Sequence, residues 1–383
     1  MSSCRQPIEC ILPPHMLNEI AQNGTLQQQQ SAQKTLMTSA ALRGQRSILT
    51  DYPALAASAA ATGKFRIVYN ADFKSDLPGR QVRTEGDPPT GDLATDEAYD
   101  GSGATYDLYN DVYARNSIDG NGLRLDSTVH YQKGYDNAFW NGQQMVYGDG
   151  DEDLPPAQRL FNRFTISLDV IGHELTHGVT QYEAKLVYSN QPGALNESMS
   201  DVFGSLVKQR QLGQTVAQAD WLIGQGLFTA KVKGAALRSM KAPGTAYDDP
   251  VLGKDPQPGH MRDYVTTFSD NGGVHINSGI PNHAFYLVAM EIGGNAWEKA
   301  GLIWYVTLRD KLGINSQFKD CAQLTYQAAG ELYGQNSLEQ QAVRKGWADV
   351  GLTVDAGGGV GCPLALLGMA SLMFSKGKTQ SNK

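Results

Sequence analysis

The chain has 383 residues, 41% of them hydrophobic and 19% charged, and is therefore long enough to build more than one hydrophobic core. Its net charge is −7, and no basic cluster has the density that a nucleic-acid partner requires, so we expect no nucleic-acid binding. The four cysteines (Cys4, Cys10, Cys321 and Cys362) are too few and too scattered for a disulfide scaffold and are predicted to be reduced thiols.

Neither end of the sequence has the pattern of a membrane segment. The first residues, MSSCRQPIECILPP, contain no apolar run of the length that a signal peptide needs. The apolar stretch 362–374 is too short to cross a bilayer. We therefore expect a soluble chain with no membrane partner, secreted or released without a recognisable signal peptide; a cytoplasmic location stays open.

The first 60 residues have the pattern of a short separate module. Pro13-Pro14-His15-Met16 predicts an extended segment followed by a helix start, and a polar, helix-forming run continues to about Leu49. Residues 51–53 break this run, and residues 54–63 form a linker of small residues. Because such linkers are favoured sites of proteolytic nicking, we expect cleavage within residues 50–65.

The remaining chain predicts an α+β fold in two lobes. Residues 65–185 form a β-rich N-terminal lobe with strands at 65–69, 128–131 and 144–147, one helix at 99–114, and a turn-rich loop at 148–153. Residues 186–352 form a mainly α-helical C-terminal lobe, with helices predicted at 196–210, 278–292, 295–312, 318–332 and 337–350. Residues 353–383 are a tail of unknown role.

The sequence His173-Glu174-Leu-Thr-His177, within a helical pattern over Leu168–Tyr182, has the spacing of a zinc half-site. Residues i and i+4 share a helix face, so both imidazoles can reach one ion, while Glu174 can lie beside a metal-bound water. Two ordinary helical histidines are the alternative. A catalytic zinc takes three protein ligands, and Glu197 at the start of the next helix can supply the third. Asp201, one turn later, can accept a hydrogen bond from a ligating imidazole.

With these residues in place, the chain resembles the thermolysin family of zinc endopeptidases. The resemblance rests on the histidine motif, on Asn196-Glu-xx-Ser-Asp201, and on three further segments: Asp136-Asn-Ala-Phe-Trp-Asn-Gly142, Leu237-Arg-Ser-Met240 and Asp270-Asn-Gly-Gly-Val-His-Ile-Asn-Ser-Gly279. It covers about residues 65–352. The segment around Pro13-Pro14 resembles the protealysin-like branch, whose propeptide is short. The resemblance implies a two-lobed peptidase with one zinc ion per chain, in the cleft between the lobes.

The resemblance also implies roles for the other site residues. Glu174 would be the general base that takes a proton from the zinc-bound water and passes it to the leaving amine. His275, oriented by Asp270, and Tyr188 would stabilise the tetrahedral oxygen. The residues that would hold the substrate backbone are Arg238, Asn137 and Ala138 through its carbonyl group. His130, on a strand pattern, is predicted to be structural.

In the family, an apolar pocket holds the substrate residue that follows the cut. The resemblance implies that four residues of this chain take its lining positions: Phe161, Phe164, Val170 and Leu237. Burying a Leu or Phe side chain in such a pocket contributes roughly 1.5–3 kcal/mol. We therefore expect cleavage on the amino side of bulky apolar residues.

The carboxylates that bind calcium in thermolysin are mostly replaced in this chain. Asp169 and Asp220 occupy matching positions, but three other ligand positions hold Lys208, Leu222 and Gln225. Calcium needs six to eight oxygen ligands, and an ammonium group repels it. We expect Lys208 to bridge the two aspartates in place of the ion, so that calcium is doubtful as a cofactor. Another calcium site stays open at Asp149–Asp153.

The short N-terminal module would act as a propeptide, that is, as an intramolecular inhibitor and folding aid. The expected apolar preference suggests self-cleavage before Leu55 or Phe65. One hypothesis for latency is that Cys4 or Cys10 binds the zinc as a thiolate. The other is that the segment around Pro13-Pro14 packs in the protein without contact with the metal.

The leading function is a zinc-dependent neutral endopeptidase, a monomer made as a latent precursor, which cleaves polypeptides. An aminopeptidase would share the ligand set but would need an acidic anchor for the substrate amine, whereas Asn137-Ala138 resembles an endopeptidase edge. An inactive binding protein that has kept its metal site is the third alternative. The presence of Glu174 and His275 argues against it.

Overall fold

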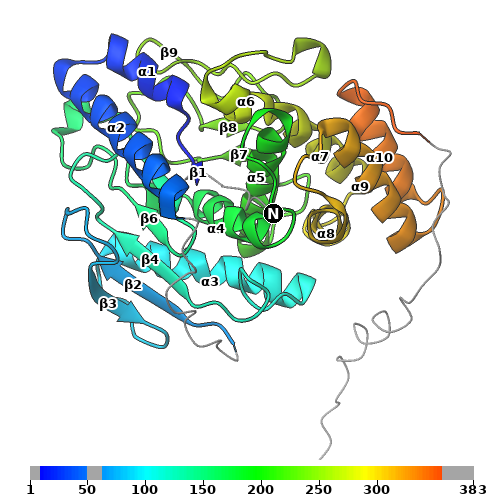
Figure 1. Ribbon diagram of the computed structural model, residues 1–383, viewed down its shortest axis with the longest axis horizontal. Coiled ribbons are helices and arrows are strands. Elements are labelled where there is room, and N and C mark those ends of the chain that lie inside the picture. Colours follow the sequence, from blue (N-terminus) through cyan, green and yellow to red (C-terminus); the bar gives the residue numbers. More distant parts are fainter. Residues whose placement is uncertain (1–8, 50–62, 356–383) are drawn as a thin grey trace, which may run out of the picture.

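The computed structural model describes residues 9–49 and 63–355 (Figure 1). Nearly all of the predicted linker, Cys4, Leu55 and most of the predicted tail lie outside the described residues. The described chain has a β-rich first half and a helical second half, which confirms the predicted α+β class. No helix in the described ranges has the length and apolar character needed to cross a bilayer.

The N-terminal module consists of one short strand and two helices: β1 (Glu9–Cys10), α1 (Pro14–Asn23) and α2 (Leu26–Leu49). Pro14 begins α1 at a position where a helix does not need a backbone N–H donor. Met16, Leu17 and Ile20 form the buried face of α1. Figure 1 shows both helices over the β-rich lobe, with β1 running into the centre of the molecule.

A six-stranded sheet with the order β1-β5-β6-β4-β2-β3 forms the first lobe. Its other strands are β2 (Arg66–Asn70), β3 (Arg80–Thr84), β4 (Leu125–Val129), β5 (Ala138–Trp140) and β6 (Met145–Tyr147). The pairs β2/β4 and β4/β6 are parallel, and the others are antiparallel. β2, β4 and β6 fall within a few residues of their predicted positions, whereas β3 and β5 were missed. Because β1 pairs with β5, the N-terminal module supplies one edge of this sheet.

The first long helix, α3 (Leu93–Tyr113), begins six residues before its predicted start at Tyr99. Asp92 caps it by accepting a hydrogen bond from the Thr95 N–H at 2.8 Å. Glycine inside α3 serves close packing: a Cβ on Gly101 would lie 2.4 Å from the Ile171 side chain.

Two helices at the centre of the molecule, α4 (Leu168–Tyr182) and α5 (Asn190–Leu212), carry the predicted metal ligands. The bounds of α4 match the prediction. The predicted start of α5 at Asn196 was wrong, because Pro192 does not break the helix: it lies in the first turn, where its missing N–H is harmless. A Cβ on Gly204 would lie 2.3 Å from the Asp169 carbonyl oxygen, and one on Gly172 would lie 3.0 Å from Gly204 Cα. Glycine therefore lets the two helices approach closely beside the metal site.

The second lobe is built from five further helices and short strand pairs. The helices are α6 (Asp270–Asn277), α7 (Gly279–Ile292), α8 (Lys299–Val306, continued by a π-helical turn at Thr307–Lys311), α9 (Phe318–Tyr333) and α10 (Leu338–Asp349). The strands are β7 (Leu222–Ile223), β8 (Arg238–Ser239), β9 (Asp248–Asp249) and β10 (Gly253–Lys254). Short 3-10 turns lie at Pro156–Gln158, Phe164–Ile166 and Met261–Asp263. The predictions for α7, α9 and α10 agree within one residue at each end, and α6 was missed.

His130 joins two segments of the β-rich lobe, as expected for a structural residue. Its Nδ1 lies 2.8 Å from Asp149 Oδ2, and its Nε2 lies 3.1 Å from Asp92 Oδ2. Burial alone would lower the pKa of His130, but the two carboxylates outweigh burial and raise it to about 9.

This raised pKa predicts a stability that depends on pH. Because the folded state holds the His130 proton more tightly than the unfolded state, the contribution is complete below about pH 6.5 and is lost as the pH rises through about 9. Thermal unfolding of wild type and His130→Gln at pH 6 and pH 10 measures it. The Tm difference should be larger at pH 6, and an equal difference at both values would contradict the charged pairing.

Candidate active site

The three predicted metal ligands converge in the structure. His173 and His177, one turn apart on α4, have their Nε2 atoms 3.0 Å from each other. Glu197 on α5 places Oε2 at 3.5 Å from the His173 Nε2 and Oε1 at 3.5 Å from the His177 Nε2. Within residues 9–49 and 63–355, these side chains are the one group of His, Cys, Asp or Glu whose ligand atoms could hold a metal.

The donor set fits zinc. Two imidazole nitrogens and one carboxylate are the protein ligands of a catalytic zinc that keeps a fourth position open. All three side chains are fully buried, and Glu197 Oε2 accepts no hydrogen bond from the described residues. A buried carboxylate oxygen without a donor is costly unless a cation lies next to it.

Both imidazoles are held from behind by groups on α5. Asp201 Oδ1 lies 2.8 Å from the His173 Nδ1, as predicted. Asn196 Oδ1 lies 2.9 Å from the His177 Nδ1. These contacts fix each ring with Nδ1 protonated and with Nε2 free to bind a metal. The role of Asn196 was missed, although it directly precedes Glu197 in the family motif.

Asp201 is also the centre of a buried polar network. The Arg238 guanidinium donates to both of its carboxylate oxygens, at 2.8 and 2.7 Å, and Asn282 Nδ2 donates to it at 2.8 Å. Burial would raise the pKa of Asp201, but Arg238 and His173 outweigh burial and hold the pKa below its usual range. Neither Asn282 nor the Asp201–Arg238 pair was anticipated, because residues on α5, α7 and β8 are brought together only by the fold.

Glu174 lies in the same buried space but outside the ligand group. The Trp140 N–H donates to its Oε2 at 3.0 Å, while Oε1 accepts no hydrogen bond from the described residues. Burial is the main reason why the pKa of Glu174 is raised well above its usual value. A carboxyl group with one oxygen anchored and the other open is suited to accept a proton.

The structure brings His275, Asp270 and Tyr188 together beside the metal ligand Glu197. Asp270 Oδ1 lies 2.6 Å from the His275 Nδ1, and the second oxygen accepts the His275 N–H at 2.8 Å. This fold-back is possible because Gly272 and Gly273 adopt φ values of 87° and 76°, where glycine is favoured. The Tyr188 hydroxyl donates to Glu197 and lies 3.3 Å from the His275 Nε2.

The first described residues of the N-terminal module occupy this site. β1 is antiparallel to β5, with Glu9 opposite Trp140 and Cys10 opposite Phe139. The Cys10 carbonyl oxygen lies 2.9 Å from the His275 Nε2. Since Nδ1 of His275 also faces an acceptor, both ring nitrogens are placed as donors, which agrees with the raised pKa of this buried imidazole beside Asp270 and Glu197.

The next two residues continue along β5. The Ile11 N–H donates to the Ala138 carbonyl at 3.3 Å, and its own carbonyl accepts from Arg238 Nη1 at 3.1 Å. The Leu12 N–H donates to Asn137 Oδ1 at 3.0 Å, and the Leu12 carbonyl accepts from Asn137 Nδ2 at 3.4 Å. Asn137, Ala138 and Arg238 were predicted to hold a peptide backbone. That the chain's own Ile11 and Leu12 contact them could not be predicted, because no motif marks these two residues.

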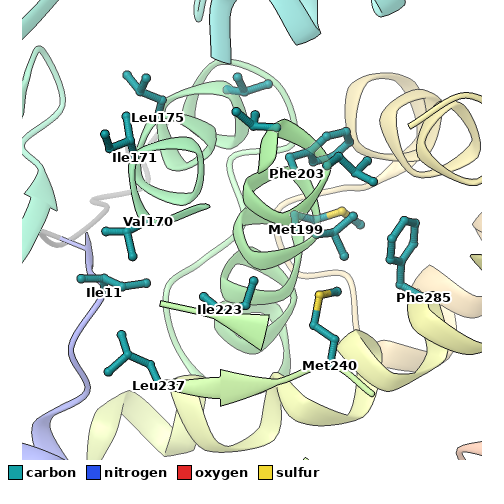
Figure 2. Close-up of a cluster of buried hydrophobic side chains, with 14 of the residues drawn as sticks. Ile11, Val170, Ile171, Leu175, Met199, Phe203, Ile223, Leu237, Met240 and Phe285 are labelled. Carbon is teal, nitrogen blue, oxygen red and sulfur yellow. The ribbon is translucent and has the colours of Figure 1, made fainter. Parts of the chain in front are cut away.

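The Ile11 side chain is fully buried in an apolar cluster. Figure 2 shows it in one cluster with Val170 and Leu237, two of the four residues predicted to line the pocket. Phe161 and Phe164 are fully buried and lie 6.0 Å apart between ring centroids. Their part in the pocket stays a prediction.

Cys10 does not join the metal group. Its side chain lies in a second buried cluster with Tyr131, Tyr135, Phe139 and Val146. Because neighbouring residues of a strand point to opposite faces, Cys10 faces away from the side on which Ile11 is buried. The hypothesis of a zinc-bound thiolate is therefore wrong for Cys10, and Cys4 lies outside the described residues.

Lys208 bridges the two aspartates, as predicted. Its Nζ lies 2.7 Å from Asp169 Oδ2 and 3.0 Å from Asp220 Oδ1, and it donates to the Leu222 carbonyl at 2.8 Å. In the loop proposed as a second calcium site, Asp149 contacts His130, and Asp151 Oδ2 accepts two backbone N–H groups.

Comparison with known proteins agrees with this geometry. The family model described as thermolysin metallopeptidase, catalytic domain, matches residues 58–181, and that described as its alpha-helical domain matches residues 184–352. An extracellular metalloprotease of Pectobacterium carotovorum subsp. carotovorum is 52% identical over 353 residues, which cover 91% of this chain and 98% of that protein. A thermolysin of Alicyclobacillus acidocaldarius subsp. acidocaldarius is 40% identical over 74% of this chain and 50% of that protein.

The solved structure of the precursor of protealysin, a metalloproteinase from Serratia proteamaculans, matches with a TM-score of 0.81 and 50% identity. The match covers 90% of this chain and 100% of the protealysin chain. The chain therefore belongs to the thermolysin family of metallopeptidases, in its protealysin-like branch, and is a zinc-dependent protease.

Proposed function

We propose that this chain is the latent precursor of an endopeptidase that cuts on the amino side of bulky apolar residues, and that residues 1–60 are its inhibitory propeptide. The observation that carries the proposal is the placement of residues 9–12. Each backbone group from the Cys10 carbonyl to the Leu12 carbonyl meets a residue to which the family resemblance gives a role in binding or catalysis.

The propeptide would block the site by lying in it as a peptide substrate lies. The Cys10 carbonyl oxygen lies within hydrogen-bond distance of the His275 Nε2, the group expected to stabilise the tetrahedral oxygen. Ile11 fills the apolar pocket that would take the residue after the cut. A substrate cannot enter while these positions are occupied. The names of the extracellular relatives support a further proposal, that the mature enzyme acts outside the cell.

The catalytic roles follow from the positions of the side chains. A zinc ion held by His173, His177 and Glu197 would polarise the scissile carbonyl and lower the pKa of a water molecule towards 7. Glu174 would accept the proton of that water on its open Oε1 and deliver it to the leaving amine. His275 and Tyr188 would donate hydrogen bonds to the oxygen on which negative charge develops, with Asp270 fixing the imidazole.

Latency should weaken when Ile11 is truncated. Ile11→Ala removes a fully buried side chain, a change that typically costs about 2–5 kcal/mol, and here the loss falls on docking of the propeptide. The purified precursor should therefore develop peptidase activity at least about tenfold faster, because 1.4 kcal/mol already corresponds to a factor of ten. Met37→Ala on α2, 73% exposed, is the control and should activate like wild type. Activation of Ile11→Ala at the wild-type rate would contradict docking through this pocket.

The mature enzyme should prefer Leu, Ile or Phe after the cut. Each buries its side chain in the pocket that holds Ile11, which contributes roughly 1.5–3 kcal/mol, or about 10- to 150-fold in kcat/KM over a polar residue. A library of blocked peptides varied at that position measures the preference. Preference for acidic residues there would refute the assignment of the pocket.

A further inference from the structure

Glu9 is a propeptide carboxylate buried against the metal ligands. Its side chain is fully buried, with Oε2 2.9 Å from the His177 Nδ1 and with Oε1 accepting from Asn196 Nδ2 at 3.2 Å. No donor among the described residues has hydrogen-bond geometry toward Oε2. Glu9 therefore contacts the His177 imidazole at Nδ1, the nitrogen that does not face the metal site, and the Glu9 Oε2 accepts no hydrogen bond from the described residues.

The strand geometry explains why Glu9 reaches this place. Side chains two residues apart on a strand point to the same face. Ile11 is buried in the apolar cluster beside Val170 of the zinc helix, and Cys10 faces the aromatic cluster on the opposite side. Pairing of β1 with β5 thus directs Glu9 toward α4, on the same side as Ile11.

Apart from the His177 imidazole, which its Oε2 contacts, the charged groups around Glu9 are mostly acidic or already paired. Glu174 and Tyr188 lie within electrostatic reach of its carboxylate, and Glu174 is itself a buried acid. Arg238, the guanidinium of this site, makes two hydrogen bonds to Asp201. Among the described residues, no lysine or arginine forms an ion pair with Glu9. A buried carboxylate in such surroundings is costly unless a positive charge lies nearby.

A divalent cation on His173, His177 and Glu197 would provide that charge. A carboxylate behind a metal-bound imidazole raises the basicity of the ligand and strengthens metal binding. Among the described residues, the carboxylate at the His177 Nδ1 comes from Glu9 of the propeptide alone. We propose that Glu9 couples propeptide docking to zinc loading: zinc tightens the docking of residues 9–12, and docked Glu9 tightens the binding of zinc. The inference rests on the proposed function, because it requires zinc at this site and residues 1–60 as the propeptide.

The reciprocal effect on zinc affinity gives the first test. The full precursor is prepared with Glu174→Ala in every sample, so that it cannot cleave itself, and zinc affinity is measured by competition with a chromogenic chelator. Glu9→Gln keeps the size of the side chain and removes the charge, and should weaken zinc binding about tenfold or more. Glu19→Gln on α1, the matched charge change within the propeptide, should leave the affinity unchanged. Equal affinity of Glu9→Gln and its parent, or an equal loss with Glu19→Gln, overturns the proposal.

The second test measures docking instead of zinc binding. An unrelated added protease cleaves α1 and α2 at a rate that is compared at saturating zinc and with chelator. Zinc should slow this cleavage about tenfold or more in the parent, and clearly less in Glu9→Gln. Equal rates with and without zinc in the parent overturn the coupling even if Glu9→Gln does not fold. A parent that binds no zinc would contradict the proposed function itself, whereas a parent that binds zinc without protecting α1 and α2 contradicts only the coupling.

Discussion

Replacing Glu174 with alanine is expected to slow hydrolysis of an internal peptide bond by about 10²–10⁴-fold while zinc stays bound. The Glu174 carboxyl is anchored by the Trp140 N–H through one oxygen and offers the other to the site. It does not belong to the ligand group of His173, His177 and Glu197. Its removal should therefore delete the proton acceptor and leave the metal site intact.

The measurement uses a peptide blocked at both ends, with zinc content determined on the same samples. Because the variant cannot remove its own propeptide, wild type and variant are both processed with an added protease, which is then inactivated. Glu291→Ala, a change at an exposed ion pair on α7, is the control and should keep full activity. Equal activity of Glu174→Ala and wild type would overturn the mechanism. Cleavage by wild type of peptides with a free amine only would indicate an aminopeptidase, and no cleavage of either peptide an inactive binding protein.

The sequence predicted the parts of the site that are local in the chain. His173 and His177 lie one turn apart on a helix whose bounds matched the prediction, because an apolar face at helical spacing and a motif on that helix agree. Glu197 and Asp201 likewise share a face of α5. Such pairs follow from helix geometry alone.

What the sequence could not predict depends on contacts between distant segments. The glycines of α3 weaken a helix locally, yet Gly101 is needed for contact with Ile171 of the zinc helix. Arg238 was expected to hold a substrate carbonyl, and the structure adds its ion pair with Asp201, which lies 37 positions away. Strand β5 and its pairing with Glu9 and Cys10 carry no periodic signal, because two- or three-residue strands are too short to show one.

Lys208→Ala is expected to lower the free energy of unfolding by about 3–5 kcal/mol, because it leaves Asp169 buried without its counter-ion. Burial would lower the pKa of Lys208, but Asp169 and Asp220 outweigh it, so the ammonium stays charged at neutral pH. Asp169 also accepts the Gly224 N–H at 2.9 Å and so ties the segment after β7 to the start of the zinc helix α4. Loss of the cation should therefore loosen the helix that carries His173. Thermal and urea unfolding of the two proteins measure the loss.

Calcium addition tests whether Lys208 has taken the place of the ion. If Lys208 supplies the positive charge, added calcium should not raise the Tm of wild type, since the ammonium repels a second cation from Asp169 and Asp220. Lys208→Glu should be unstable without calcium and should regain part of its Tm when calcium is added, because it restores an acidic ligand between two existing ones. Lys345→Ala, which breaks an exposed pair with Glu291, should leave the Tm unchanged in either condition. A large calcium-dependent rise of the wild-type Tm that disappears in Asp169→Ala would show that the ion, and not the lysine, neutralises this site.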